Sequence, residues 1–113
     1  MLKKDILTKQ GLRTLSDKMG NYDPMSYHNG SIWPFDNWFF VEALDKYNYK
    51  NEAGKIRKSI LSSLEILGSP YECFTMIDGN LGLKLHTLDG QDLYPEKIQA
   101  WTVGTMFSFL KKS

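Results

Sequence analysis

Apolar residues between positions 32 and 67 follow two helical patterns that differ in how much of the helix surface they cover. From about Ile32 to Tyr47, apolar side chains occur nearly all round a helix, a pattern typical of a helix buried on most sides. From about Glu52 to Leu67, they recur only at three- and four-residue steps, which predicts a second helix with one buried stripe. The stripe consists of Ala53, Ile56, Ile60, Leu64 and Leu67.

Residues at the ends of these segments are typical of helix termini. Pro34 falls in the first turn of the first helix, where its missing N–H would have no intrahelical partner. Asp36 lies in the same turn, where a carboxylate interacts favourably with the positive end of the helix dipole. Gly68 stands directly after the second helix, where a glycine C-cap is common.

The remaining sequence predicts a third helix, a hairpin and a long loop. The third helix is expected from about Glu96 to Lys112, opened by Pro95. "MIDGNL" contains an Asp-Gly pair between apolar residues and predicts a hairpin. Residues 9–30 are rich in glycine and turn formers, so we interpret them as ordered loop, and loops of this length are usually functional. The third helix is expected to bury a stripe of Ile98, Val103, Met106, Phe107 and Leu110.

These elements predict a mainly all-α fold of three long helices with a small β-hairpin insert. Residues 1–10 fit either a short helix or an extended lead, in which Leu2, Ile6 and Leu7 are the apolar positions. The first helix has more apolar surface than two amphipathic neighbours can cover. This mismatch indicates that the single domain predicted over residues 1–113 is part of a larger structure.

Charge, apolar stretches and metal-ligand spacing argue against several classes of function. A net charge of +1 gives no field that would attract nucleic acid or an anionic membrane. No stretch approaches the roughly 20 apolar residues of a membrane helix, and residues 1–10 do not look like a signal peptide. Cys73 is the single cysteine, which suits a reducing compartment, and we expect a cytoplasmic protein. His28, His86 and Cys73 lack metal-ligand spacing and no nucleotide motif occurs, so neither a metal nor another cofactor is expected.

Polar and aromatic residues collect at the ends of the predicted helices. If the first and third helices point the same way, the loops that precede them meet at one end. A pocket there would suit a neutral ligand with many hydroxyls, because sugars need planar polar groups for their hydroxyls and rings for their C–H faces. The candidate lining residues are Arg13, His28, Trp33, Asp36, Glu72, Gln99 and Trp101.

The order of four short blocks resembles the C-terminal part of the amylo-α-1,6-glucosidase, or glycogen debranching enzyme, family. The blocks are "GLRTLS", "YDPMSYHNGSIWPFDN", "YECF" and "IQAW", and they cover about residues 9–110. The block "YHNGSIWP" followed by "DN" is the most specific. The resemblance implies a C-terminal segment of the (α/α)6 toroid of six-hairpin glycosidases.

The resemblance also implies roles for individual residues. Glu72 corresponds to the general base that activates water, although "PYEC" replaces the family's "PEL". Phe35 stands where relatives often carry histidine. The residues implied to contact sugar are Arg13, Tyr27, His28, Trp33, Asp36, Gln99 and Trp101.

The function expected from this resemblance is that of a fragment or subunit of an inverting α-glycosidase acting on an α-glucan or oligosaccharide. Inverting enzymes need a second carboxylic acid roughly 6.5–9.5 Å from the base, and in relatives it lies in a part of the toroid that is absent here. We therefore expect no activity from the chain alone. We also expect a homo-oligomer or binding to a complementary toroid segment, because exposed aromatic surface favours association.

Simpler interpretations of the same residues remain open. The chain as a whole fits a non-catalytic remnant, an interaction module or a carbohydrate-binding module. Glu72 fits a solvated loop residue, and His28 fits a hydrogen-bonded structural histidine. Asp36 fits a helix N-terminal stabiliser, and the aromatic rings fit ordinary core.

Overall fold

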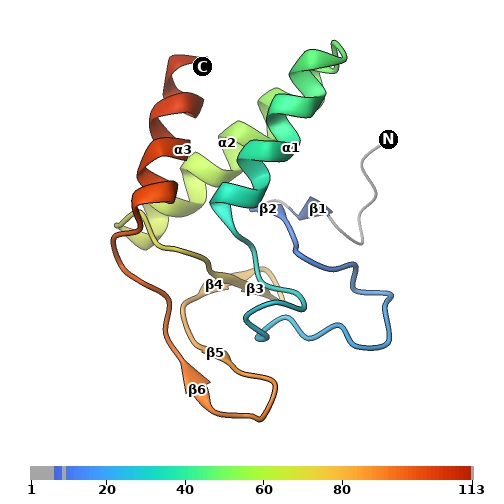
Figure 1. The fold of residues 1–113 in the computed structure, drawn as a ribbon, viewed down its shortest axis with the longest axis vertical. Coiled ribbons are helices and arrows are strands. Elements are labelled where there is room, and N and C mark those ends of the chain that lie inside the picture. The colour runs from blue at the N-terminus through green and yellow to red at the C-terminus, as the bar shows by residue number, and fades with distance from the viewer. Residues whose placement is uncertain (1–6, 9, 113) are drawn as a thin grey trace.

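The computed structural model describes residues 7–8 and 10–112. Within these residues the chain forms three α-helices and three two-stranded antiparallel sheets (Figure 1). The helices are α1 (Pro34–Lys46), α2 (Lys50–Leu67) and α3 (Ala100–Lys111). The strands are β1 (Leu7–Thr8), β2 (Gly11–Leu12), β3 (Thr75–Ile77), β4 (Asn80–Gly82), β5 (Leu85–His86) and β6 (Asp92–Leu93).

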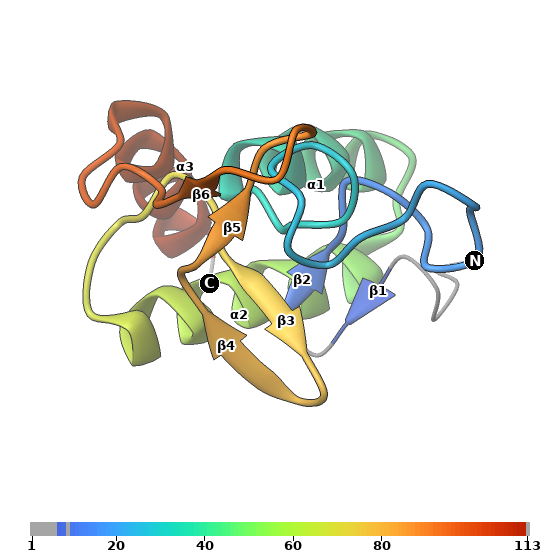
Figure 2. The ribbon, with the colours of Figure 1, turned by 90° about the horizontal axis from the view of Figure 1, so that it is seen from below.

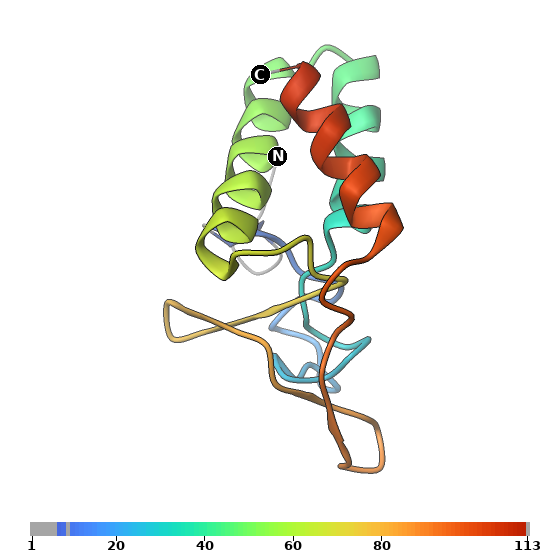
Figure 3. The same cartoon turned by 90° about the vertical axis from the view of Figure 1, so that its left-hand side faces the viewer.

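The three helices stand side by side, with the loops and the β5–β6 hairpin gathered at one end (Figures 1 and 3). α1 and α3 run in the same direction. Near their N-termini the rings of Phe35 and Trp101 stack with centroids 4.9 Å apart. Near their C-termini the Lys112 ammonium lies 2.8 Å from the Glu42 carboxylate. The loops before both helices therefore meet at the same end, as the site prediction required.

The predicted stripe of α2 forms the centre of the core. Ala53, Ile56 and Ile60 are completely buried, and Leu64 is nearly so. Leu67 is half-buried. The helix ends at Gly68, which adopts the left-handed conformation with φ 83° and donates its N–H to the Leu64 carbonyl. The buried partners of the stripe are Leu12, Ile32, Val41, Leu44, Phe74 and Phe109.

The Asp-Gly hairpin forms where the sequence predicted it. β3 and β4 pair in antiparallel register, and Asp78 and Gly79 between them both have positive φ, 50° and 80°. Two central residues with positive φ match the right-handed twist of the strands that they join. Two further strand pairs form within the described residues, β1–β2 and β5–β6, and the β5–β6 pair closes around the second Asp-Gly pair of the sequence, Asp89-Gly90 (Figure 2). Of the N-terminal lead, Leu2 and Ile6 lie outside the described residues, and Leu7 is extended in β1.

The predicted start of the third helix is wrong by four residues. α3 begins at Ala100, and the extended Gln99 caps it by accepting from the Trp101 N–H at 3.5 Å. The preceding residues are held extended by contacts to another part of the chain. The Gln99 N–H donates to the Pro70 carbonyl at 3.0 Å, and the Glu96 carbonyl accepts from the Glu72 N–H at 2.9 Å. These tertiary hydrogen bonds replace the first helical turn.

The buried stripe predicted for the third helix is also wrong. Ile98, Phe107 and Leu110 are exposed, and Val103 and Met106 are only half-buried. The buried side chains of α3 are Thr102, Thr105 and Phe109. The threonines tolerate burial because both hydroxyls are hydrogen-bonded: Thr102 donates to the Tyr71 carbonyl, and Thr105 donates to the Trp101 carbonyl, each at 2.9 Å.

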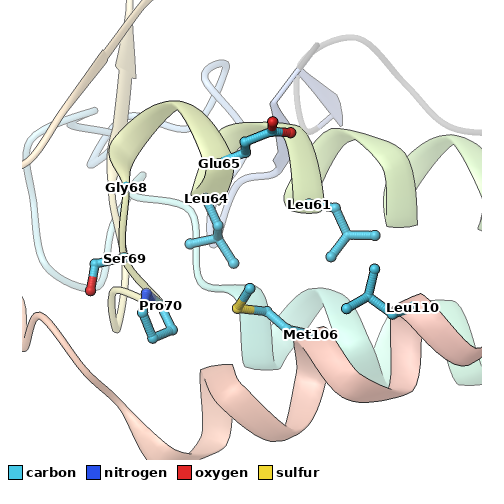
Figure 4. Close-up of a pocket in the computed structure, with 8 residues that line it drawn as sticks. All are labelled: Leu61, Leu64, Glu65, Gly68, Ser69, Pro70, Met106 and Leu110. Carbon is cyan, nitrogen blue, oxygen red and sulfur yellow. The ribbon is translucent and has the colours of Figure 1, made fainter.

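Much of the aromatic surface of α1 and α3 faces solvent. The prediction that α1 is buried on most sides is wrong within this chain, since Phe39 and Phe40 are exposed. On α3, Trp101, Phe107 and Leu110 are exposed as well. An apolar groove of about 450 Å³ lies between α2 and α3, and Figure 4 shows Leu61 and Leu64 of α2 pointing toward Met106 and Leu110 of α3. The lining residues are Leu61, Leu64, Glu65, Gly68, Ser69, Pro70, Met106 and Leu110.

A buried amide joins the start of α1 to β2. Asn37 is 1% exposed, and its Oδ1 accepts from the Leu12 N–H at 2.7 Å. Its Nδ2 donates to the carbonyls of Leu12 at 3.2 Å and Trp33 at 2.8 Å. One side chain thus satisfies both backbone groups of Leu12, which a buried position requires.

Asn37→Ala should lower the free energy of unfolding by roughly 2–4 kcal/mol, because the N–H and carbonyl of Leu12 lose their partner in a buried place. Asn51→Ala, at an exposed position in α2, is the matched control and should change stability by less than about 0.5 kcal/mol. Urea unfolding followed by circular dichroism measures both. Equal stability of the two variants would contradict the role given to Asn37.

Candidate active site

The backbone around Ile32 brings two distant loops together. Ile32 and Phe74 exchange both of their backbone hydrogen bonds, at 2.8 and 2.9 Å, and both residues are fully buried. On its other side Ile32 forms an antiparallel bridge with Arg13. The residues just before and after these pairs, 27–33 and 70–74, therefore lie against one another.

The loop "YHNGSIW" folds compactly onto itself. The Ser31 hydroxyl donates to the Tyr27 carbonyl at 2.8 Å, and the Trp33 indole N–H donates to the same carbonyl at 3.0 Å. Gly30 lies directly against the backbone of Asp23, so closely that a Cβ at this position would overlap the Asp23 carbonyl. The glycine is thus required by close approach of two chain segments.

Three rings from this loop form a cluster. Tyr27 meets His28 and Trp33 edge to face, with centroids 4.6 and 4.8 Å apart. His28 and Trp33 lie nearly parallel, at 5.9 Å and an interplanar angle of 10°. We call Tyr27, His28, Trp33 and Glu72 the base cluster. His28 is exposed and the other three are half-buried, so the cluster is open to solvent on one side.

Glu72 joins these rings from the opposite loop. The Tyr27 hydroxyl donates to Glu72 Oε2 at 2.8 Å. Glu72 Oε1 accepts a longer bond of 3.5 Å from the Glu96 N–H. The carboxylate is therefore oriented by a phenol on one oxygen, whereas its other oxygen keeps capacity for a further donor such as water.

The surroundings shift the pKa values of three neighbouring groups. Burial, followed by the hydrogen bond to Glu72, raises the pKa of the Tyr27 phenol well above its ordinary value. Burial also raises the pKa of the Cys73 thiol, which makes this cysteine a poor nucleophile. Desolvation raises the pKa of Asp36, and the neighbouring His28 acts in the opposite direction. Asp36 nonetheless remains solvent-exposed in the first turn of α1.

The start of α3 is fixed beside Glu72 by Gln99, but Trp101 has a different neighbour. Gln99 bonds through its N–H to Pro70, two residues before Glu72. Trp101 is 60% exposed and stacks on Phe35 rather than on Trp33. Phe35 and Trp101 together line a second groove of about 330 Å³ between α1 and α3.

Arg13 lies at the edge of this region. Its backbone bridges to Ile32, next to Trp33. Its guanidinium pairs with the Asp17 carboxylate at 3.2 Å and lies over the Tyr22 ring at 5.5 Å. The structure thus joins Tyr27, His28, Trp33 and Glu72 directly, brings Asp36 near His28, and gives Arg13 and Trp101 other partners.

Two contacts near the base cluster were missed by sequence reasoning. Phe35 supports Trp101, and its position in the "WPFDN" block was the available signal. His86 binds Asp23 through Nε2 at 2.8 Å and so fastens the β5–β6 hairpin to the loop before Tyr27. The sequence offered no signal for this contact, because Asp23 and His86 are 63 positions apart.

Among the described residues, no group of three or more His, Cys, Asp or Glu side chains is arranged to hold a metal ion. None of the helices in that same part of the chain is long and apolar enough to cross a bilayer.

Residues 1–102 match the mannosylglycerate hydrolase MGH1-like glycoside hydrolase domain. The chain belongs to this glycoside hydrolase family. No curated protein matches the chain. The predicted relationship to six-hairpin-type glycosidases is therefore confirmed, and it supports a glycosidase-related function. The narrower resemblance to glycogen debranching enzymes stays a prediction.

An absorbance titration of tyrosinate tests the burial of Tyr27 in this family's candidate site. Because its folded-state pKa is raised, Tyr27 should add nothing to the ionisation step near the ordinary tyrosine pKa of about 10. The stability contributed by the protonated phenol is fully present below that pH and is lost as pH rises towards the higher folded-state pKa. Tyr27→Phe should therefore leave the amplitude near pH 10 unchanged, and loss of one tyrosine's amplitude there would contradict the half-buried, hydrogen-bonded Tyr27–Glu72 pair.

Proposed function

We propose that the chain supplies the general-base side of an inverting α-glycosidase site. The observation that carries this proposal is the 2.8 Å hydrogen bond from Tyr27 to the Glu72 carboxylate within a cluster of exposed and half-buried rings. Glu72 would take a proton from water as the water oxygen attacks the anomeric carbon. A carboxylic acid on the opposite side of the sugar would give a proton to the departing glycosidic oxygen.

The base cluster has the surfaces that a sugar needs. The rings of Tyr27, His28 and Trp33 offer apolar faces to C–H groups. Glu72 and Gln99 offer polar atoms beside them, since Gln99 is fixed to the same loop through Pro70. Asp36 adds a carboxyl group near His28. Arg13 and Trp101 are proposed to contribute from the rim of the site.

The acid is proposed to come from a complementary segment of an (α/α)6 toroid, of which this chain would form the C-terminal part. The exposed aromatic surface supports this arrangement, because Phe39 and Phe40 on α1 and Trp101 on α3 need covering. The apolar groove between α2 and α3 adds to the same unfilled surface. Association of several copies of this chain would cover it too, as a homo-oligomer.

The substrate is proposed to be an α-linked oligosaccharide. The "YHNGSIWP" and "IQAW" blocks favour an α-glucan, through the resemblance to debranching enzymes. The matched family's description favours an α-mannoside, since it refers to a mannosylglycerate hydrolase. Glucose- and mannose-based ligands should therefore be tested together.

A second candidate function is a carbohydrate-binding module without catalysis. It is favoured by one observation: the rings of Tyr27, His28 and Trp33 form an aromatic floor beside the hydrogen-bonded Glu72 carboxylate, and such a floor can bind a sugar without hydrolysing it. Sugar binding is common to both functions, whereas hydrolysis with a complementary segment belongs only to the first.

Binding of glucose, maltose or mannose should quench tryptophan fluorescence with a dissociation constant in the millimolar range. The affinity is expected to be weak because this chain would supply only part of the contacts to the sugar. A millimolar dissociation constant corresponds to about 4 kcal/mol of binding free energy. Trp33→Ala should abolish the quenching, whereas Trp38→Phe, on the side of α1 that bonds Ser108, should retain it.

The competing interpretation makes Trp33 ordinary core. In that case the parent protein would show no response to any of the three sugars, and Trp33→Ala would cost about 3–5 kcal/mol of stability as a large-to-small core substitution. Those two results together would contradict the proposed sugar site.

A further inference from the structure

A third hollow adjoins the base cluster on the side of the β5–β6 hairpin. Its volume is about 400 Å³, which falls within the roughly 300–1,000 Å³ of small-molecule sites. It shares Tyr27 and His28 with the base cluster. The complete lining is Ser26, Tyr27, His28, Thr87, Leu88 and Asp89.

We propose that this hollow binds the second sugar unit of an oligosaccharide whose first unit lies at Glu72. This inference rests on the proposed function, and it assigns the hairpin tip, residues 87–89, as a specificity-determining wall. The unit that it accepts is a neutral pyranose.

The hairpin is held firmly against the loop that carries Tyr27. The His86 N–H donates to the Met25 carbonyl at 2.8 Å, and the His86 carbonyl accepts from the Tyr27 N–H at 3.2 Å. The His86 ring adds its 2.8 Å contact to the Asp23 carboxylate. Figure 2 shows the hairpin lying along this loop. The hollow is therefore a preformed gap between two segments joined by backbone and side-chain bonds.

The tip of the hairpin is a closed turn that fixes the outer wall. The Thr87 N–H donates to the Gln91 carbonyl at 2.9 Å, and the Gln91 N–H donates to the Thr87 hydroxyl at 3.1 Å. Gly90 completes the turn with φ 86°. This turn holds Leu88 in solvent, 87% exposed, at the edge of the hollow.

The chemistry of the lining suits a sugar ring. Leu88 and Tyr27 offer apolar surface for a C–H face, and the exposed His28 ring offers nitrogen atoms for hydroxyls. The Thr87 hydroxyl already donates to the Asp89 carboxylate and accepts from the Gln91 N–H, so Thr87 holds the wall in shape. Asp89 adds a carboxylate, which accepts hydroxyl hydrogen bonds but repels an anionic group. The lining thus favours a neutral second unit, and covering Leu88 would remove its apolar surface from water.

The test compares monosaccharides with the matching disaccharides on the full chain. Affinities are measured by NMR titration for two pairs, glucose with maltose and mannose with α-linked mannobiose. We expect the disaccharide of the recognised pair to bind about tenfold more tightly than its monosaccharide. Backbone amide signals of Thr87, Leu88 and Asp89 should shift with the disaccharide and not with the monosaccharide.

Leu88→Ser should reduce disaccharide affinity to that of the monosaccharide and leave monosaccharide affinity unchanged. Because Leu88 is exposed, the variant should fold normally, which a thermal melt verifies. Ile66→Ser is the control: it removes a similarly exposed apolar side chain, 66% exposed on α2, and should change neither affinity.

The outcomes separate the two levels of the proposal. Monosaccharide binding without any gain for the disaccharide, or a gain that survives Leu88→Ser, would overturn the second-unit site and leave the proposed function standing. No response to any of the four sugars would contradict the proposed function itself, and the second-unit site with it.

Discussion

The pairing of Ile32 with Phe74 is the constraint on which the rest of the structure depends. Two backbone hydrogen bonds, both shielded from water, join a residue that precedes α1 to one that follows α2. Such shielded bonds are costly to leave unmade, so the two loops have little freedom to separate. Tyr27 and Glu72 are carried on these loops, and their contact follows from this pairing.

Hydrogen-bonded polar side chains and solvent-exposed aromatic side chains occupy different regions of the molecule. Around Ile32 each buried polar side chain described above is satisfied, as the three bonds of Asn37 illustrate. On α1 and α3 the opposite holds, because Phe39, Trp101 and Phe107 remain in solvent. A chain that supplies one wall of a larger glycosidase barrel would have both properties, and a self-contained domain would need only the first.

The sequence predicted those elements whose signals are local. The stripe of α2 and the Asp78–Gly79 turn depend on spacing within a few residues, and both were predicted correctly. The start of α3 depends on bonds from Gln99 and Glu96 to residues near position 70, so helix propensity alone placed it too early. The burial of Thr102 in place of Leu110 likewise depends on the Tyr71 carbonyl, which accepts its hydroxyl.

The same distinction applies to the site. Tyr27 and Glu72 were predicted as site residues because the "YHNGSIWP" and "YECF" blocks resemble a known family. In the structure a hydrogen bond joins these two side chains. Sequence reasoning did not identify the wall at residues 87–89, because His86 joins the hairpin to the loop of Tyr27 through backbone bonds and a contact to Asp23 that no local pattern encodes. The preference of Trp101 for Phe35 is a side-chain contact between two helices and is equally non-local.

The central claim is that Glu72 serves as the base of a site completed by another segment. The most direct measurement is hydrolysis of α-glucoside and α-mannoside oligosaccharides by this chain alone, by a polypeptide carrying the complementary toroid helices, and by the two together. The account predicts turnover only in the mixture, lost with Glu72→Gln and retained with the control Glu96→Gln, because both hydrogen bonds between Glu96 and Glu72 use the Glu96 backbone. Turnover by the chain alone, or a mixture whose activity survives Glu72→Gln, would contradict it.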